Sequence, residues 1–289
     1  MRLLPTVAAV VTAAVAVAGP ARAGAMDVDL HGLVDTSGAA PQTRDEDFRL
    51  LVRDLGLIFT PTNIQPAETT GVSGFDFAMQ YSFHPMALDK PYWQDALVQK
   101  GTRLPMTLGA SARKGFVLPV PLASEIEMGA QWLIESRMLN MGANVRLALN
   151  EGFTGNHWWS FIPDLAVNMG INRVVGSDDL DLLTVTAGGA VSKGFGLFGS
   201  VNVCPYFGYQ SIFINGATRV IDADPIDTTN VDDNVVFTVV SLTENRVDRF
   251  SGGLRVIVAH VMFSAGVDAD VVDANTTLLH YGIRTGLNF

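Results

Sequence analysis

The sequence has one cysteine, little charge, and no long apolar run after its first residues. Because Cys204 is alone, an internal disulfide is excluded. Beyond residue 18 no stretch approaches eighteen consecutive apolar residues, so no membrane-spanning helix is expected there. Charged residues make up 17% of the chain, and the formal net charge is −10. This acidic excess argues against nucleic acid as a partner, because binding to phosphates needs clustered Lys and Arg.

Apolar residues are abundant, at 48% of the chain with a mean hydropathy of +0.27. They fall in alternating runs: within 125–135, Met128 and Trp132 alternate with Glu127 and Gln131. Successive side chains of a β-strand point to opposite faces, so this pattern predicts strands with one apolar and one polar face. The same alternation recurs in 138–150, 164–172, 262–271 and 276–289.

Strand length separates two folds that share this alternation. A soluble sandwich usually has strands of about five or six residues, whereas these runs extend over roughly ten to fourteen, which suits tilted membrane strands. We therefore predict an all-β fold, an antiparallel transmembrane β-barrel of about 12 strands over residues 54–289, with 10–14 allowed. The predicted strands are 54–62, 71–84, 103–114, 121–135, 138–150, 162–174, 180–192, 196–213, 234–245, 249–259, 262–271 and 276–289.

The connections between these strands test the count. If Phe289 lies at the periplasmic end, the short turns near 136–137, 175–179 and 260–261 lie there too. The longer segments 85–102 and 214–233 then fall at the same end, where connections are usually short. A hidden hairpin or a miscounted strand would remove this conflict.

The N-terminal residues have the pattern of an export signal. A short basic start at Met1-Arg2 precedes an apolar run to Ala18, and Ala21-Arg22-Ala23 supplies small residues for cleavage. This predicts a cleaved signal peptide over 1–23. A membrane anchor is the alternative, but the run is about sixteen residues long and spanning takes about twenty. No cysteine follows the run, which disfavours a lipoprotein anchor.

Residues 24–53 form a separate N-terminal segment that is polar at first and then helical. Thr43 and Glu46 have the spacing of a capping box, and apolar residues at helical spacing follow, which predicts a short helix near 44–53. We therefore expect a flexible or helical segment that is a candidate plug for the barrel. A second short helix, opened by Pro91, is expected within 85–102.

The last strand carries a resemblance to a known class. Over 276–289, Leu279, Tyr281, Ile283, Leu287 and the final Phe289 share one face. With the export signal, this strand resembles the closing strand of bacterial outer-membrane β-barrel proteins. The resemblance covers about residues 54–289 and is one of architecture.

Membership of that class would imply a location in the Gram-negative outer membrane. Outer-membrane lipid and the barrel-assembly machinery would be partners, and Tyr281, Leu287 and Phe289 would form the assembly signal. Arg284 stands where the class signal usually has glycine, which weakens the match slightly.

No enzyme activity, cofactor or metal is expected. The outer-membrane phospholipase carries a His-x-Ser pair, and none of the five histidines here has serine two places on. The run Gly194–Gly199 matches G-x-G-x-x-G, but a strand follows it where a dinucleotide site requires a helix. A glycine-rich hairpin is therefore predicted.

The polar faces of the strands define the predicted lumen. Carboxylates outnumber arginines on these faces, which predicts a channel or uptake protein for small neutral or cationic solutes and disfavours anions. Two alternatives remain open: a transporter of hydrophobic molecules with an N-terminal plug, and a structural or interaction barrel without transport. The candidate lumen residues are Glu125, Glu127, Gln131, Glu135, Arg146, Asp164, Asp268 and Arg284.

Overall fold

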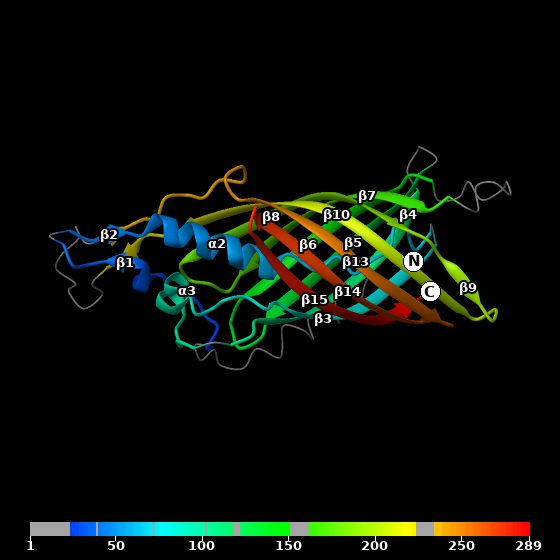
Figure 1. Ribbon diagram of the computed structural model, residues 1–289, viewed down its shortest axis with the longest axis horizontal. Helices are drawn as coiled ribbons and strands as arrows, with labels where there is room; N and C mark the ends of the chain where they lie inside the picture. The colour runs from blue at the N-terminus through cyan, green and yellow to red at the C-terminus, as the bar shows by residue number, and fades with distance from the viewer. Residues whose placement is uncertain are drawn as a thin grey trace, which may run out of the picture.

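Long antiparallel strands close into a barrel in the computed structural model (Figure 1). The structure describes residues 24–38, 40–71, 73–101, 103–117, 122–150, 162–223 and 234–289; the predicted signal peptide at 1–23 lies outside them. The strands of the wall are β3 (Phe75–Phe83), β4 (Met106–Val117), β5 (Ala123–Leu133), β6 (Leu139–Ala148), β7 (Asp164–Val175), β8 (Leu180–Ser192), β10 (Val201–Thr218), β13 (Arg246–Val258), β14 (Val261–Asp273) and β15 (Thr276–Asn288).

The wall is closed. Strands β3 to β8 pair in sequence, β10 pairs with both β8 and β13, and β15 pairs with β3. Backbone hydrogen bonds between Phe289 and Phe75, at 2.9 and 3.0 Å, complete the seam. A closed sheet leaves no unpaired edge, which is the condition for a sheet to lie in hydrocarbon. The predicted all-β antiparallel barrel is confirmed.

Ten strands form the wall, two fewer than the twelve predicted but within the allowed range. Residues 54–62 are not a strand, because helix α2 (Asp45–Phe59) continues through them until Pro61 removes a backbone donor. Residues 234–245 do not cross the wall either. They contribute β12 (Asn234–Val235), which pairs with β11 (Ile221–Asp222), and a bridge from Val240 to Gly216.

Removing 234–245 from the wall resolves the conflict over the connections. Every connection before this segment changes ends, so 85–102 and 214–233 lie at the end opposite Phe289, and the prediction that they share its end is wrong. The turns near 136–137 and 175–179 move with them, whereas the turn at 259–260 stays beside Phe289. The longest connections thus gather at one end, as in membrane barrels.

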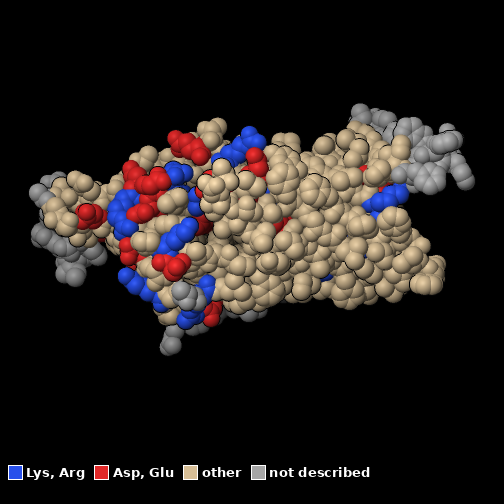
Figure 2. Space-filling view, viewed as in Figure 1, with Lys and Arg blue, Asp and Glu red and all other residues tan. Residues whose placement is uncertain are grey.

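The outer surface of the barrel is apolar. Met128, Met141, Met169 and Ile283 are each half or more exposed on it, and Figure 2 shows almost no charge over the barrel on the visible face. Charged side chains gather instead at the end that carries the helices. Among the residues that the structure describes, the helices are too short or too polar to cross a membrane.

A compact cap covers the end opposite Phe289. It contains α2, the 3-10 helix η1 (Leu30–Leu33), α3 (Pro91–Ala96) and a small sheet of β1 (Val34–Asp35) and β2 (Gln42–Thr43). The predicted helices near 44–53 and after Pro91 are thus confirmed, although α2 extends to Phe59. The apolar faces of these helices pack against the ends of β8 and β10 that lie nearest the cap. Together they form one core, whose buried members include Leu33, Phe48, Leu51, Trp93, Ile214 and Phe237.

One buried carboxylate ties the two helices of the cap together. Asp54 of α2 accepts hydrogen bonds from the Tyr92 hydroxyl at 2.7 Å and from Trp93 Nε1 at 3.1 Å, both on α3. Burial, reinforced by the Asp54 carboxylate, raises the pKa of the Tyr92 hydroxyl. The Tyr92 hydroxyl therefore stays protonated and can donate to Asp54 over the ordinary pH range.

Candidate functional site

The lumen of the barrel is occupied by the chain itself. After α2 ends at Phe59, residues 60–71 run from the capped end through the barrel toward Phe75, where β3 begins beside Phe289. The segment in the lumen, which we call the lumen segment, comprises residues 60–70. It lies beyond the boundaries 24–53 that the sequence indicated for a plug. The reason is that α2 continues to Phe59, whereas the predicted helix ended near residue 53.

Arg249 fixes the end of the lumen segment that lies nearest the cap. Its guanidinium donates to the carbonyls of Leu57, Thr60 and Pro61, each at 3.2 Å, and so satisfies carbonyls that the end of α2 leaves free. Two further bonds, at 2.5 and 2.8 Å, join the same group to Asp270. Arg249 is fully buried, so this junction is one charged group shared by helix, segment and wall.

A network of charged side chains surrounds the middle of the lumen segment. Arg113 pairs with Asp76 at 3.0 Å and with Glu125 at 3.3 Å. Arg284 pairs with Asp76 at 3.0 Å and with Glu127 at 2.9 Å. Such a buried network is stable when every charge has a partner, and it fixes the geometry of the groups that it contains.

The part of the lumen segment nearest Phe289 bonds to three strands of the wall, β5, β6 and β8. The Pro66 carbonyl accepts from Arg146 at 2.9 Å, and the Ala67 amide donates to Ser192 Oγ at 3.0 Å. The Thr70 amide donates to Glu125 at 2.9 Å. The segment is thus held by polar contacts along its whole length.

Two histidines meet beside the ion pair of Arg249 and Asp270. His84 Nδ1 and His280 Nδ1 are 2.9 Å apart; His280 also pairs with Asp270 at 2.8 Å, and His84 Nε2 lies 3.1 Å from Thr107 Oγ1. Both rings are fully buried and neither lines the cavity described next. The arrangement is a rigid polar chain that extends from Arg249 to β4.

A polar cavity of about 100 Å³ lies beside the lumen segment. The segment presses against β14 and β15, where Ile64 packs on Gly266 and Gly282, so the free space lies toward the opposite wall. The β4–β7 part of that wall has inward glycines, Gly109, Gly129, Gly142 and Gly170, at which no side chain fills the lumen. Amide side chains also line the space: Asn63, Gln65, Gln80, Gln131, Asn140, Asn144, Asn168, Asn172 and Gln210.

Most of the predicted lumen residues lie inside the barrel. Glu125, Gln131, Arg146, Asp268 and Arg284 are buried there. Glu127 joins them with 18% of its side chain exposed. Asp164 is half-buried at the first position of β7, on the rim.

The lumen position predicted for Glu135 is wrong. This residue follows β5 in a turn with a φ of 63°, and its side chain is about half exposed and paired with Arg103. The strand ends at Leu133, so the alternation of faces does not reach Glu135.

Sequence reasoning missed several lumen charges. Arg113, Arg249 and Asp76 are buried in the lumen, and Glu68 of the lumen segment pairs with Arg255 of the wall. The alternation of Thr107, Ser111 and Arg113 along β4 was a usable signal, because these residues share one face. Glu68 carried no such signal, since it lies in a segment without regular structure.

These additions alter the expected charge of the lumen. Each of six lumen carboxylates lies within 4.0 Å of one of five arginines, as Glu125 does with Arg146 at 3.8 Å; the six are Glu68, Asp76, Glu125, Glu127, Asp268 and Asp270. These pairs offset most of the acidic excess on which the predicted preference for cations was based.

The predicted assembly residues lie on the outer surface. Tyr281, Leu287 and Phe289 are 43%, 44% and 63% exposed and point away from the lumen. The Phe289 ring stacks on His260, with centroids 5.6 Å apart, beside the turn between β13 and β14. The glycine-rich run at 194–199 forms the predicted hairpin, where β9 (Phe195–Leu197) pairs with β10 and Gly199 has a φ of 74°.

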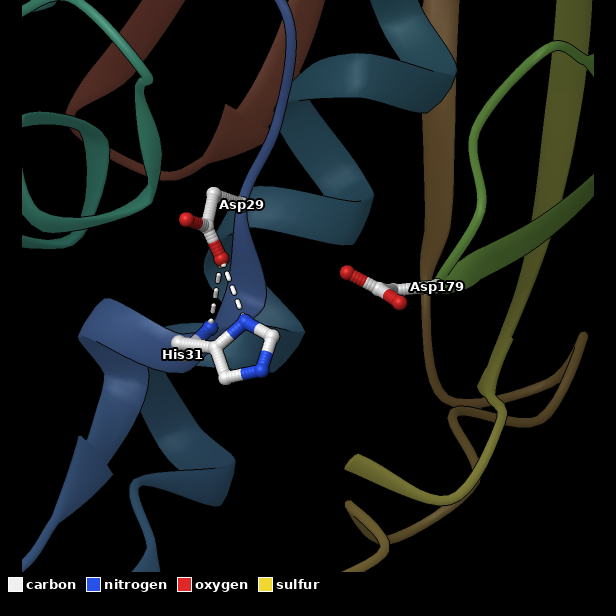
Figure 3. A group of neighbouring side chains, drawn as sticks. All are labelled: Asp29, His31 and Asp179. Atoms are coloured by element: carbon white, nitrogen blue, oxygen red, sulfur yellow. Dashed lines mark hydrogen bonds and ion pairs between the residues drawn. The ribbon is translucent and has the colours of Figure 1, made fainter. Parts of the chain in front are cut away.

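One group of three residues in the cap has the composition of a cation site. Asp29 and His31 come from η1 and its N-cap, and Asp179 comes from the turn before β8 (Figure 3). His31 Nδ1 lies 2.6 Å from Asp29, whereas the close-up shows Asp179 bonded to neither of them. Asp29 and His31 are exposed, and Asp29 already serves as the helix cap.

The comparisons with known proteins give a likeness of fold alone. No protein-family model and no curated protein matches the chain. Three bacterial outer-membrane barrels are similar in structure. Ail, the attachment invasion locus protein of Yersinia pestis, has a TM-score of 0.27 at 10% identity over 75% of this chain and 99% of that one.

The N-terminal β-barrel domain of Pseudomonas aeruginosa OprF has a TM-score of 0.29 at 11% identity, covering 76% and 99% of the two chains. The translocator domain of the autotransporter NalP from Neisseria meningitidis has 0.38 at 10%, covering 77% and 89%. The closed wall, the apolar outer surface and the polar lumen together define this chain as a β-barrel of the bacterial outer-membrane class.

Proposed function

We propose that this protein is a plugged outer-membrane barrel whose resting state is closed. The observation that carries the proposal is the lumen segment, which is bonded to inward charged side chains along its whole path. Displacement of this segment would open a route for small uncharged solutes. The proposal keeps the uptake function expected from the sequence and replaces its open, cation-preferring lumen with a gated, locally neutral one.

The polar lining of the lumen favours this function over transport of hydrophobic molecules. The space beside the lumen segment is bordered by amides, glycines and paired charges, and an apolar cargo would strip water from them without replacing their hydrogen bonds. The buried apolar side chains of the cap pack against one another in one core.

The orientation follows from the same geometry. With the Phe289 end facing the periplasm, the cap and the long connections face the outside, as in other barrels of this class. Residues 24–59 would then be displayed at the cell surface, joined to the barrel through its own lumen. No enzymatic activity is proposed.

Planar-bilayer recordings test the plug. Three forms are compared: the full chain, a form without 24–53, and a form without 24–70. We expect the first two to remain closed, because both keep the lumen segment, and we expect the third to conduct steadily. Equal conductance of all three forms would contradict the proposal. A silent third form with normal heat-modifiable mobility on gels would favour the non-transporting barrel.

A further inference from the structure

The polar cavity beside the lumen segment has features that the plug alone does not explain. Gln131, Asn140 and Gln210 line it, and each is at least nine-tenths buried. Within the described residues, the amide oxygen of each has no hydrogen-bond partner. Burying an acceptor without a donor is unfavourable, so three such acceptors around one space suit an occupant that carries hydrogen-bond donors.

The cavity also presents donors. Arg146 and Arg284 line it, and in the described structure the Nε–H of each lacks a partner. Their charges are already matched, by Glu125 at 3.8 Å and by Glu127 at 2.9 Å. A charged ligand would bring a charge that no side chain is left to balance. The ligand should therefore be uncharged.

Hydroxyl groups suit this combination of free groups. A hydroxyl donates one hydrogen bond and accepts two, so it can donate to an amide oxygen and accept from a guanidinium N–H. The cavity volume of about 100 Å³ is room for several water molecules, each of which needs roughly 10–15 Å³ by this measure. A compact polyol would fill the same space, with its hydroxyl groups held together on one short carbon chain.

The wall is shaped for such an occupant. Gly129 and Gly142 are direct cross-strand partners and both line the cavity. A Cβ at position 142 would overlap Asn172 Oδ1, so the glycine lets an amide approach the wall closely. Asn144 remains half-exposed beside it, which leaves its amide available to the space.

We propose that this cavity is a binding site for a small uncharged polyol of three or four carbons. The biological role of this site rests on the proposed function, because the bound polyol would represent the class of solute that the barrel admits. Binding itself needs only the closed, full-length barrel and can be measured without transport.

Saturation-transfer NMR on the full chain in detergent micelles tests the site. The probes are erythritol, as a compact polyol, and raffinose, as an uncharged solute too large for the cavity. We expect transfer to erythritol and none to raffinose. Asn144→Leu removes an amide on the wall opposite the lumen segment, and it should weaken erythritol binding roughly two- to tenfold, the effect of one lost hydrogen bond.

Two further variants complete the test. Asn140→Leu removes one of the unpartnered acceptors and should weaken binding similarly. Asn275→Leu changes an exposed turn residue of the same type and should leave binding unaltered. Gel mobility with and without boiling verifies that each variant is folded. Absence of transfer in the wild type, or equal transfer in all variants, would overturn the site. Binding without conductance in the form lacking 24–70 would retain the site and reject the gated route.

Discussion

Ile64 of the lumen segment occupies the space in front of Gly282 on β15. A Cβ atom at position 282 would overlap Ile64 Cδ1 and would lie 2.7 Å from Thr62 Oγ1. The backbone of β15 is therefore approached as closely as glycine permits, and the lumen segment is packed as well as hydrogen-bonded. A substitution at this contact therefore tests whether packing holds the lumen segment in place.

A larger residue at this position should unseat the lumen segment. We expect Gly282→Val to destabilise the folded barrel by about 1–3 kcal/mol, the usual cost of overpacking, and to produce openings in bilayer recordings. Urea unfolding in detergent measures the first effect. Adding Ile64→Ala should recover much of the loss, because it removes the overlapping atoms. Gly252→Ala is the control, since a Cβ there would meet only the Tyr206 carbonyl oxygen, at an unstrained 4.0 Å, and instability of this control equal to that of Gly282→Val would remove the argument.

Removal of the charge that joins α2 to the wall should be costly. Arg249→Gln would leave Asp270 buried without its bidentate partner and would free the carbonyls at the end of α2. We expect a loss of about 3–5 kcal/mol in the free energy of unfolding. Arg249→Lys should recover only part of it, because an ammonium group cannot reproduce the planar fork.

An exposed ion pair supplies the comparison for Arg249. Arg173 pairs with Asp181 at 2.8 Å with 64% of its side chain exposed. We expect Arg173→Gln to cost between 0 and about 1 kcal/mol. If the two arginine variants had the same unfolding midpoint, Arg249 would not hold the junction as described.

Charge on the outer surface of the barrel should be poorly tolerated. Met128 is 63% exposed near the middle of β5, and Met128→Arg should destabilise the barrel by about 2–4 kcal/mol in lipid. Val98→Arg, at an exposed apolar position in the cap, should be close to neutral. Refolding titrations into vesicles measure both, and equal effects would place Met128 outside the lipid-facing surface.

Gln131 points into the lumen, and this direction alone would predict that Gln131→Arg is nearly neutral. The contacts of Gln131 contradict that expectation. The amide of Gln131 is buried and donates to Thr107 Oγ1 at 2.5 Å and to the Ile58 carbonyl at 3.4 Å. An arginine there would disturb the part of the lumen nearest the cap, so we expect this variant to be destabilised too.

Labelling of intact cells tests the orientation. In a Cys204→Ala background, Ser37→Cys in the cap should react with a membrane-impermeant maleimide, because it lies on the outer side in the proposed orientation. Phe198→Cys, at the tip of the opposite hairpin and 97% exposed, should react after permeabilisation alone. The reverse pattern would invert the barrel.

The strands of this barrel could be predicted from the sequence because their signal is local. Each has an apolar face against lipid and a polar face toward the lumen, so residues such as Met128 and Glu127 reveal their directions by alternation alone. Helix α2 was similarly visible through the helical spacing of Phe48, Leu51 and Leu55, and α3 through Pro91 in its first turn. The predicted capping box of Thr43 and Glu46 is not formed, because the N-cap of α2 is Arg44, which makes no side-chain cap bond. The class of the protein follows from these patterns.

What fills the lumen was decided by tertiary structure. The lumen segment has no periodicity, because its partners are side chains from many strands far along the chain, such as Asp268 for the Asn63 amide at 3.0 Å. For the same reason the pairing of charges was hidden: Arg284 meets Asp76 across the seam of the closed barrel. Alternation determines whether a charge points inward, but the closure of the wall and the path of residues 60–70 determine what it meets there.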